Sequence, residues 1–229
     1  MKRLWSICIW FCVYLSFPSA LLAEGKDNLW AAVMHAVVEQ RWDDAEKLFK
    51  VGIAQNRSEA ENFFWRERVD STFRKKMALN LGEFYRKQHK HEKAVTFYNE
   101  LVKMDSRNPE YLSLLAEQQV CCGKETEALK TYENILSLHP DDLTANIYIG
   151  NYYFFYAEKT KKRLDEAYAA LETPTRMQYA AYRNGLADLL KTEYARARQY
   201  FEKVMAQFPS TQIAKTLERI RQVEAEIAR

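Results

Sequence analysis

Apolar side chains recur at helical spacing through most of the chain. One stretch places Met77, Leu81, Phe84 and Tyr85 on the same side of a helix, and residues 94–101 repeat this arrangement. A single helix cannot bury such a stripe by itself, so each stripe must pack against another helix. The pattern therefore predicts amphipathic helices that associate in pairs.

Short polar segments separate the helical stretches. Asp105–Pro109 and His139–Asp142 are turn-like, and Asp141 or Asp142 can cap the helix that follows. They are therefore expected to be short connections between successive helices.

A four-residue motif that ends in alanine occurs five times along the chain. The alanines are Ala45, Ala94, Ala128, Ala167 and Ala197, and the apolar residues four positions later are Phe49, Tyr98, Tyr132, Leu171 and Phe201. Successive alanines are 49, 34, 39 and 30 residues apart, so the period is close to 34. The sequence thus predicts about five structural repeats.

Further small residues, aromatic residues and prolines hold fixed places around these alanines. The small residues upstream of the alanines are Gly82, Ala116, Gly150 and Gly185. Tyr85 follows Gly82 and Tyr153 follows Gly150, while Pro140 follows Ala128 and Pro209 follows Ala197. With these positions the sequence resembles the tetratricopeptide-repeat family over Lys26–Ser210. The resemblance implies an all-α, right-handed superhelical solenoid of antiparallel helix pairs. It also implies a concave groove lined by the first helix of each pair.

The chain departs from an even repeat in three places. Extra residues between Gln55 and Lys75 include Ser58–Glu61, which favours an additional or extended helix. A second surplus falls near Ala157–Arg163 and includes the basic run 161–163, which we expect to be a solvated turn, with a phosphate or lipid-headgroup contact as the alternative. Thr211–Ile227 has the charged amphipathic pattern of a capping helix, which solenoids need at their ends.

The N-terminus has the order of a secretory signal peptide. Lys2 and Arg3 precede the apolar run Leu4–Phe17, and Pro18 then precedes small residues. We expect cleavage after Ala23 and export of the protein to the periplasm or the extracellular space. The chain then consists of a signal peptide at 1–23, a repeat domain at 24–210 and a capping helix at 211–229. The alternative is that residues 4–23 stay as a membrane anchor.

Composition and charge narrow the function classes. The 229 residues are 48% hydrophobic and 28% charged with only six Gly and five Pro, which excludes long disorder. Loss of Lys2 and Arg3 with the signal peptide lowers the formal charge from +3 to +1. A charge this small argues against a generally basic nucleic-acid binder.

Residues that could carry catalysis or bind a metal have simpler explanations. Cys121 and Cys122 are adjacent, which disfavours an ordinary disulfide, and they are either a redox or metal pair or the end of a helix before Gly123. His89 and His91 lack a third ligand nearby. The sequence has no phosphate-binding glycine loop and no nucleophile motif, so we predict neither a cofactor nor an enzyme.

The expected function is protein recognition on the first helices of the repeats. Residues 146–156 are rich in aromatic side chains, which form either core or a binding surface. The candidate partner-binding residues are Tyr148, Asn151, Phe155, Tyr182, Arg183, Glu117, Lys76, Asn80, Glu83 and Arg86. The sequence thus predicts a noncatalytic scaffold or peptide-binding adaptor of the cell envelope, with a membrane-tethered assembly factor as the alternative. Its partner would be a protein or peptide rather than nucleic acid, and membrane contact is expected only if the N-terminal segment is retained.

Overall fold

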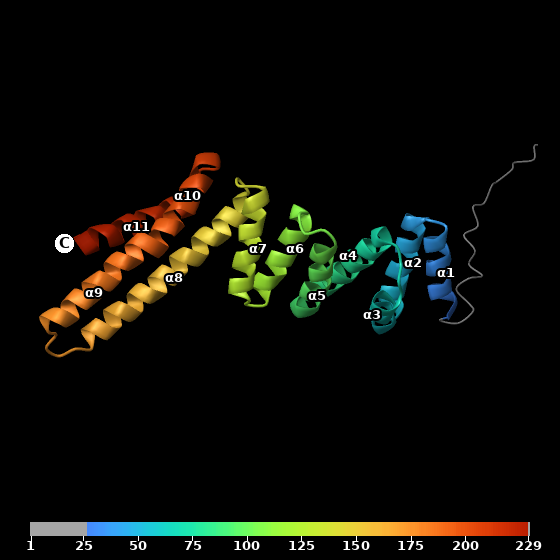
Figure 1. Cartoon of the computed structure of the whole chain (residues 1–229), viewed down its shortest axis with the longest axis horizontal. Coiled ribbons are helices and arrows are strands. Elements are labelled where there is room, and N and C mark those ends of the chain that lie inside the picture. The colour runs from blue at the N-terminus through green and yellow to red at the C-terminus, as the bar shows by residue number, and fades with distance from the viewer. Residues whose placement is uncertain (1–26, 229) are drawn as a thin grey trace, which may run out of the picture. The chain divides into compact units, whose positions relative to one another are not determined.

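The computed structural model describes residues 27–228, and all regular secondary structure in this range is helical (Figure 1). The expected signal peptide and its cleavage site lie outside the described residues. No helix within this range is long and apolar enough to cross a membrane. The predicted all-α class is therefore confirmed for the part of the chain that the structure describes.

The chain divides into two compact units after Met77, within α4 (Ser71–Lys87). The N-terminal unit contains α1 (Asp27–Val38), α2 (Trp42–Gln55), α3 (Arg57–Arg66) and the start of α4. The C-terminal unit contains the rest of α4, α5 (His91–Met104), α6 (Pro109–Cys121), α7 (Glu125–Leu138), α8 (Leu143–Ala169) and the helices that follow.

Aromatic rings form the core of the N-terminal unit. The ring of Phe49 from α2 lies within 6.1 Å of the rings of Phe63 and Phe73, and Trp30 of α1 stacks on Phe63 at 4.8 Å. The expected additional helix is present as α3. It begins where the Asn56 side chain accepts a hydrogen bond from the backbone N–H of Glu59. The surplus after the first repeat therefore adds a helix that supplies core rings.

Helix pairs stack in sequence order in the C-terminal unit, and α5, α6, α7 and α8 each contact the next. Gly82 of α4 lies directly against the Tyr98 ring of α5, where a methyl group would clash with the ring. Leu112 and Ala116 of α6, Ala128 of α7 and Ile149 of α8 share one buried cluster. The predicted solenoid of paired helices is confirmed by these contacts.

The turn within each of the first three repeats requires one residue with a left-handed backbone. Gln40, His89 and Gly123 have φ values of 56°, 54° and 70°, and each lies five residues before one of the repeated alanines. Only Gly123 takes this conformation without steric cost, since a Cβ disfavours it by about 1 kcal/mol. Cys121 and Cys122 lie at the end of α6, directly before this turn. This agrees with the interpretation that they end a helix before Gly123.

The expected turn near Ala157–Arg163 is wrong, because α8 continues unbroken to Ala169. No glycine or proline occurs between residues 151 and 169, so nothing in the local sequence stops the helix. The basic run 161–163 therefore lies on a helix. Lys161 is largely buried, whereas Lys162 and Arg163 are exposed.

The last motif alanine, Ala197, is likewise not preceded by a turn between two helices. The helix α9 (Arg176–Leu189), the π-helical segment η2 (Leu190–Tyr194) and α10 (Ala195–Gln207) follow one another without a loop. Together with α8 they form a long hairpin, with α9 along the second half of α8 and α10 along its first half (Figure 1). This hairpin is found where the sequence predicts two short, successive helix pairs.

Phe201 of α10, rather than Leu171, packs against Gly150. A Cβ at Gly150 would lie 2.8 Å from the Phe201 ring. The small residue and the following motif alanine are 12 positions apart in Gly82–Ala94 and Ala116–Ala128, but 47 apart in Gly150–Ala197. The hairpin thus inserts about one repeat length between the two helices of the fourth repeat.

The C-terminal helix α11 (Thr211–Ala228) has the predicted amphipathic pattern. It buries Ile213, Ile220, Val223 and Ile227 in a cluster shared with α8, α9 and α10. Its other side is mostly exposed. The predicted capping helix is therefore present, and it covers the hairpin.

The motif alanines differ in burial, so a larger side chain should change the stability of the protein by different amounts at different alanines. Ala128 is fully buried, so Ala128→Leu should lower the free energy of unfolding by about 1–3 kcal/mol through overpacking. Ala167 is exposed on α8, so Ala167→Leu should change it by less than about 0.5 kcal/mol. Urea denaturation of both variants provides the measurement. Equal midpoints for the two variants would contradict the assignment of Ala128 to a tight helix contact.

Candidate functional site

The exposed side of α6 and α8 in the C-terminal unit carries three of the predicted binding residues. Glu117 is exposed on α6, and Asn151 is half-buried on α8. Phe155 lies one turn beyond Asn151 and exposes 64% of its surface. Most other phenylalanines in the described chain are buried, so Phe155 is the predicted site residue with the most apolar surface in water.

Tyr148 contributes mainly to the core edge. Its ring lies 4.4 Å from that of Tyr132, and its hydroxyl donates to the backbone carbonyl of Glu125 at 3.3 Å. Burial raises the pKa of Tyr148 to about 12, so the hydroxyl is neutral and fixed at physiological pH. Its binding role stays a prediction, and only its exposed edge is available to a partner.

Tyr182 and Arg183 lie in a different part of the hairpin from Phe155. The Tyr182 hydroxyl donates to Asp165 at 2.7 Å, and its ring stacks on Tyr168 at 4.5 Å. Asp165 is ten residues beyond Phe155 on α8, which is about 15 Å along the helix axis. Arg183 donates to the backbone carbonyl of Ile227 in α11. Both predicted residues therefore already have partners within the chain.

The predicted residues on α4 have contrasting environments. Lys76 is half-buried in the N-terminal unit, where its ammonium lies 2.6 Å from Glu46 and 3.3 Å from Asp43. The hydrogen bond with Glu46 raises the pKa of Lys76. Asn80 is half-buried in the C-terminal unit, and Glu83 lies 3.9 Å from Lys87. The ammonium of Lys76 is thus held by carboxylates of its own unit.

Two buried polar groups lie near Gly82. They are Nε of Arg86 on α4 and the hydroxyl of Tyr98 on α5. Burial raises the pKa of Tyr98 to about 12, so this hydroxyl keeps its proton. The side chain of Arg86 interacts with this hydroxyl, so the two groups belong to the interior of the helix pair. The sequence did not distinguish Tyr98 from an ordinary core ring.

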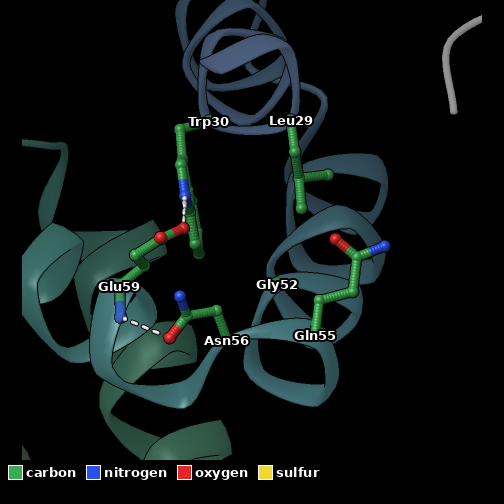
Figure 2. Close-up of a pocket in the computed structure, with 6 residues that line it drawn as sticks. All are labelled: Leu29, Trp30, Gly52, Gln55, Asn56 and Glu59. Carbon is green, nitrogen blue, oxygen red and sulfur yellow. Dashed lines mark hydrogen bonds between the residues drawn. The ribbon is translucent and has the colours of Figure 1, made fainter. Parts of the chain in front are cut away.

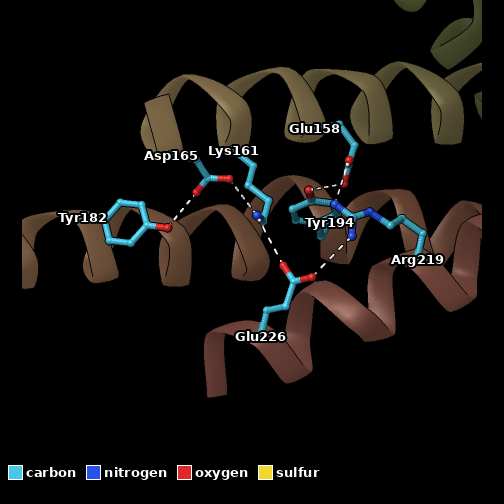
Figure 3. A network of polar contacts seen from close by, with 7 residues as sticks. All are labelled: Glu158, Lys161, Asp165, Tyr182, Tyr194, Arg219 and Glu226. Atoms are coloured by element: carbon cyan, nitrogen blue, oxygen red, sulfur yellow. Dashed lines mark hydrogen bonds and ion pairs between the residues drawn. The ribbon is translucent and has the colours of Figure 1, made fainter. Parts of the chain in front are cut away.

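A chain of polar contacts fixes the second half of α8 to α9, η2 and α11 (Figure 3). At its centre Lys161 lies 2.8 Å from Asp165 and 3.4 Å from Glu226. Burial by itself lowers the pKa of Lys161, but the bonds and charges of Asp165 and Glu226 raise it overall. The inward position of Lys161 is thus explained by two carboxylates within the chain.

The other end of the same chain of contacts involves Glu158. It accepts from the hydroxyl of the fully buried Tyr194 at 2.6 Å and lies 3.3 Å from Arg219 of α11. Burial and the bond to Glu158 raise the pKa of Tyr194. Each of these polar groups has a partner, as a structural network requires. The network therefore stabilises the hairpin.

A pocket in the N-terminal unit is too small for a metabolite. Leu29 and Trp30 line it from α1 and Gln55 from α2, and Glu59 accepts a hydrogen bond from the indole N–H of Trp30 (Figure 2). The pocket encloses about 70 Å³, whereas small-molecule sites typically measure about 300–1,000 Å³. This pocket therefore gives no support to an enzymatic site.

Candidate metal ligands do not converge within residues 27–228. No group of three or more His, Cys, Asp or Glu side chains there could hold a metal ion. His91 shares a hydrogen bond of 2.9 Å with the amide oxygen of Gln118, and its ring centroid lies 5.9 Å from that of His89. Cys121 is exposed and Cys122 half-buried, and both are free thiols.

No protein-family model and no curated protein sequence matches the chain. Among solved structures, a candidate protein-binding protein from Bacteroides ovatus is 40% identical, with a TM-score of 0.76, and the match covers 89% of this chain and 100% of that one. A MamA protein matches at 16% identity and a TM-score of 0.38, over 66% of this chain and 82% of that one. A thermophilic TPR protein of Thermus thermophilus matches at 17% identity and a TM-score of 0.33, over 88% and 100%. The last two scores are too low to carry an argument, so the Bacteroides ovatus structure is the informative comparison.

Proposed function

We propose that the chain, which belongs to the same family as the Bacteroides ovatus protein and folds into tetratricopeptide-like helix pairs, is a noncatalytic scaffold or peptide-binding adaptor of the cell envelope. Partners bind on the exposed side of the first helices in the C-terminal unit. The Bacteroides ovatus protein is described as a candidate protein-binding protein, and this supports a protein or peptide as the ligand.

The exposure of Phe155 is the observation that carries the proposal. A phenylalanine ring with 64% of its surface in water forgoes much of the roughly 1.5–3 kcal/mol that full burial provides. Binding of a partner segment would recover that free energy, and aromatic rings are frequent hot spots of protein interfaces. Asn151 on the preceding turn offers an amide donor and acceptor to a partner's backbone.

Replacement of Phe155 should separate binding from folding. Phe155→Ala should weaken capture of partners from a cell-envelope extract by about 1–2 kcal/mol, or roughly 5–30-fold in affinity, and leave helicity unchanged. Phe208 at the end of α10 is 61% exposed, so Phe208→Ala is a control with matched exposure. The measurement is the amount of each captured protein at increasing bait concentration, with circular dichroism for folding.

Equal losses of capture for Phe155→Ala and Phe208→Ala would remove the first-helix side as the binding site. Tyr148→Ala and Arg183→Ala extend the same test to residues that already have partners within the chain. We expect smaller losses of capture for them than for Phe155→Ala.

The cell-envelope location rests on the sequence of residues 1–23. A fusion of Met1–Glu24 to a reporter that is active only outside the cytoplasm should be exported and shortened. A full-length reporter that is exported but stays in the membrane would favour the alternative of a membrane-tethered assembly factor. A full-length, inactive reporter in the cytoplasm would contradict both locations.

A further inference from the structure

The outward side of α8 carries a row of aromatic and basic side chains that the network of Figure 3 does not use. This row, which we name the α8 stripe, consists of Phe155, Tyr156, Lys159, Lys162 and Arg163. All five residues are exposed, with 64% exposure for Phe155 and 52% for Tyr156. Of the five, only Phe155 is among the binding residues expected from the sequence, which predicted a solvated turn at the basic run.

Helix geometry places the stripe on one side. Phe155 and Lys159 are four residues apart, and Lys159 is three and four residues from Lys162 and Arg163, so their side chains are neighbours on the surface. The intervening residues turn inward: Ala157 is fully buried, and Lys161 takes part in the network at the hairpin interior (Figure 3). The stripe is about 12 Å long.

The cations of the stripe form few ion pairs with carboxylates among the described residues. Lys159 and Arg163 form no ion pair among the described residues, and Lys162 lies 3.7 Å from Glu166, a pair that is mostly exposed and therefore weak. The inward Lys161, by contrast, has two carboxylates. The stripe is thus a local basic surface beside two exposed rings, on a protein whose formal net charge is small.

We propose that the α8 stripe binds an acidic protein segment that also carries apolar side chains. The apolar side chains cover Phe155 and Tyr156, and Asp or Glu side chains lie against Lys159, Lys162 and Arg163. The inference rests on the proposed function and adds the chemistry of the partner. It also gives a role to the second half of α8, which an ordinary repeat lacks.

Charge arithmetic favours a protein over nucleic acid or a membrane. Proteins that hold DNA through its backbone neutralise about 6–10 phosphates, and the stripe has three cations. Basic clusters that hold anionic lipid carry about four to eight cations at about 1 kcal/mol each. Three cations are enough, however, to select an acidic peptide and to accelerate its association when the rings supply the contact area.

Selection from a displayed library of random peptides tests the partner chemistry. Peptides selected on the full-length protein should be enriched in Asp and Glu together with apolar residues. Binding of the best peptide, followed by fluorescence anisotropy, should weaken about tenfold in the double variant Lys159→Glu/Arg163→Glu. Binding to the parent protein should weaken as salt is raised, because salt screens the attraction between the cations and the acidic peptide. Exposed cations elsewhere in the C-terminal unit give a matched control, Arg107→Glu/Lys130→Glu, which should stay within about twofold of the parent.

Several results would overturn the inference. These are selected peptides without acidic enrichment, no selected peptides at all, or peptide binding that the charge-reversed variant retains. Binding of phosphatidylserine vesicles or of a single-stranded oligonucleotide at physiological salt, lost on charge reversal while peptide binding persists, would assign the stripe to that other class. If Phe155→Ala abolishes peptide binding and charge reversal does not, the proposed function stands and only the acidic partner is wrong.

Discussion

Close packing between a small residue on one helix and an aromatic ring on the next is the contact on which the repeats depend. Gly82 leaves the space that the Tyr98 ring occupies, and Gly150 does the same for Phe201. Cores packed this densely cannot accept an added methyl group without displacement of the ring, so these contacts set the pairing of the helices. The exposed side of the first helices follows from that pairing, because the inward side is committed to the rings.

The hairpin shows how the same contact survives a large insertion. Gly150 still meets an aromatic ring, although the ring comes from α10, beyond about one extra repeat length of chain. The added half of α8 is stabilised by α9 and α11 through the chain of contacts from Tyr182 to Tyr194 (Figure 3). The network directs one side of the helix inward, and the stripe is what remains on the outside. The insertion therefore extends the exposed surface beyond that of a single repeat.

The sequence predicts an element correctly where its helix boundary signals and its apolar periodicity indicate the same helix. The capped start of α8 at Asp142, the left-handed turn at Gly123 and the extra helix α3 each combine a helix boundary signal with apolar periodicity. The last two repeats could not be predicted, because the motif at Ala167 satisfies the spacing without a preceding turn residue. Periodicity alone does not distinguish two short helices from one long helix. Only the contact of Gly150 with Phe201 decides between them.

The candidate site was predictable only in part for a related reason. Phe155 and Glu117 are exposed as expected, since their positions follow from short-range helix periodicity. No local pattern indicates the partners of Tyr182, Arg183 and Lys76, because those partners are distant in the sequence or lie on another helix.

The most direct test of the glycine–ring contact is a double-mutant cycle between Gly150→Ala and Phe201→Leu, with the free energy of unfolding as its readout. The account predicts a coupling of about 1 kcal/mol or more between these two positions and none between Gly150→Ala and Leu171→Ala. Coupling of Gly150 to Leu171 instead of Phe201 would contradict it.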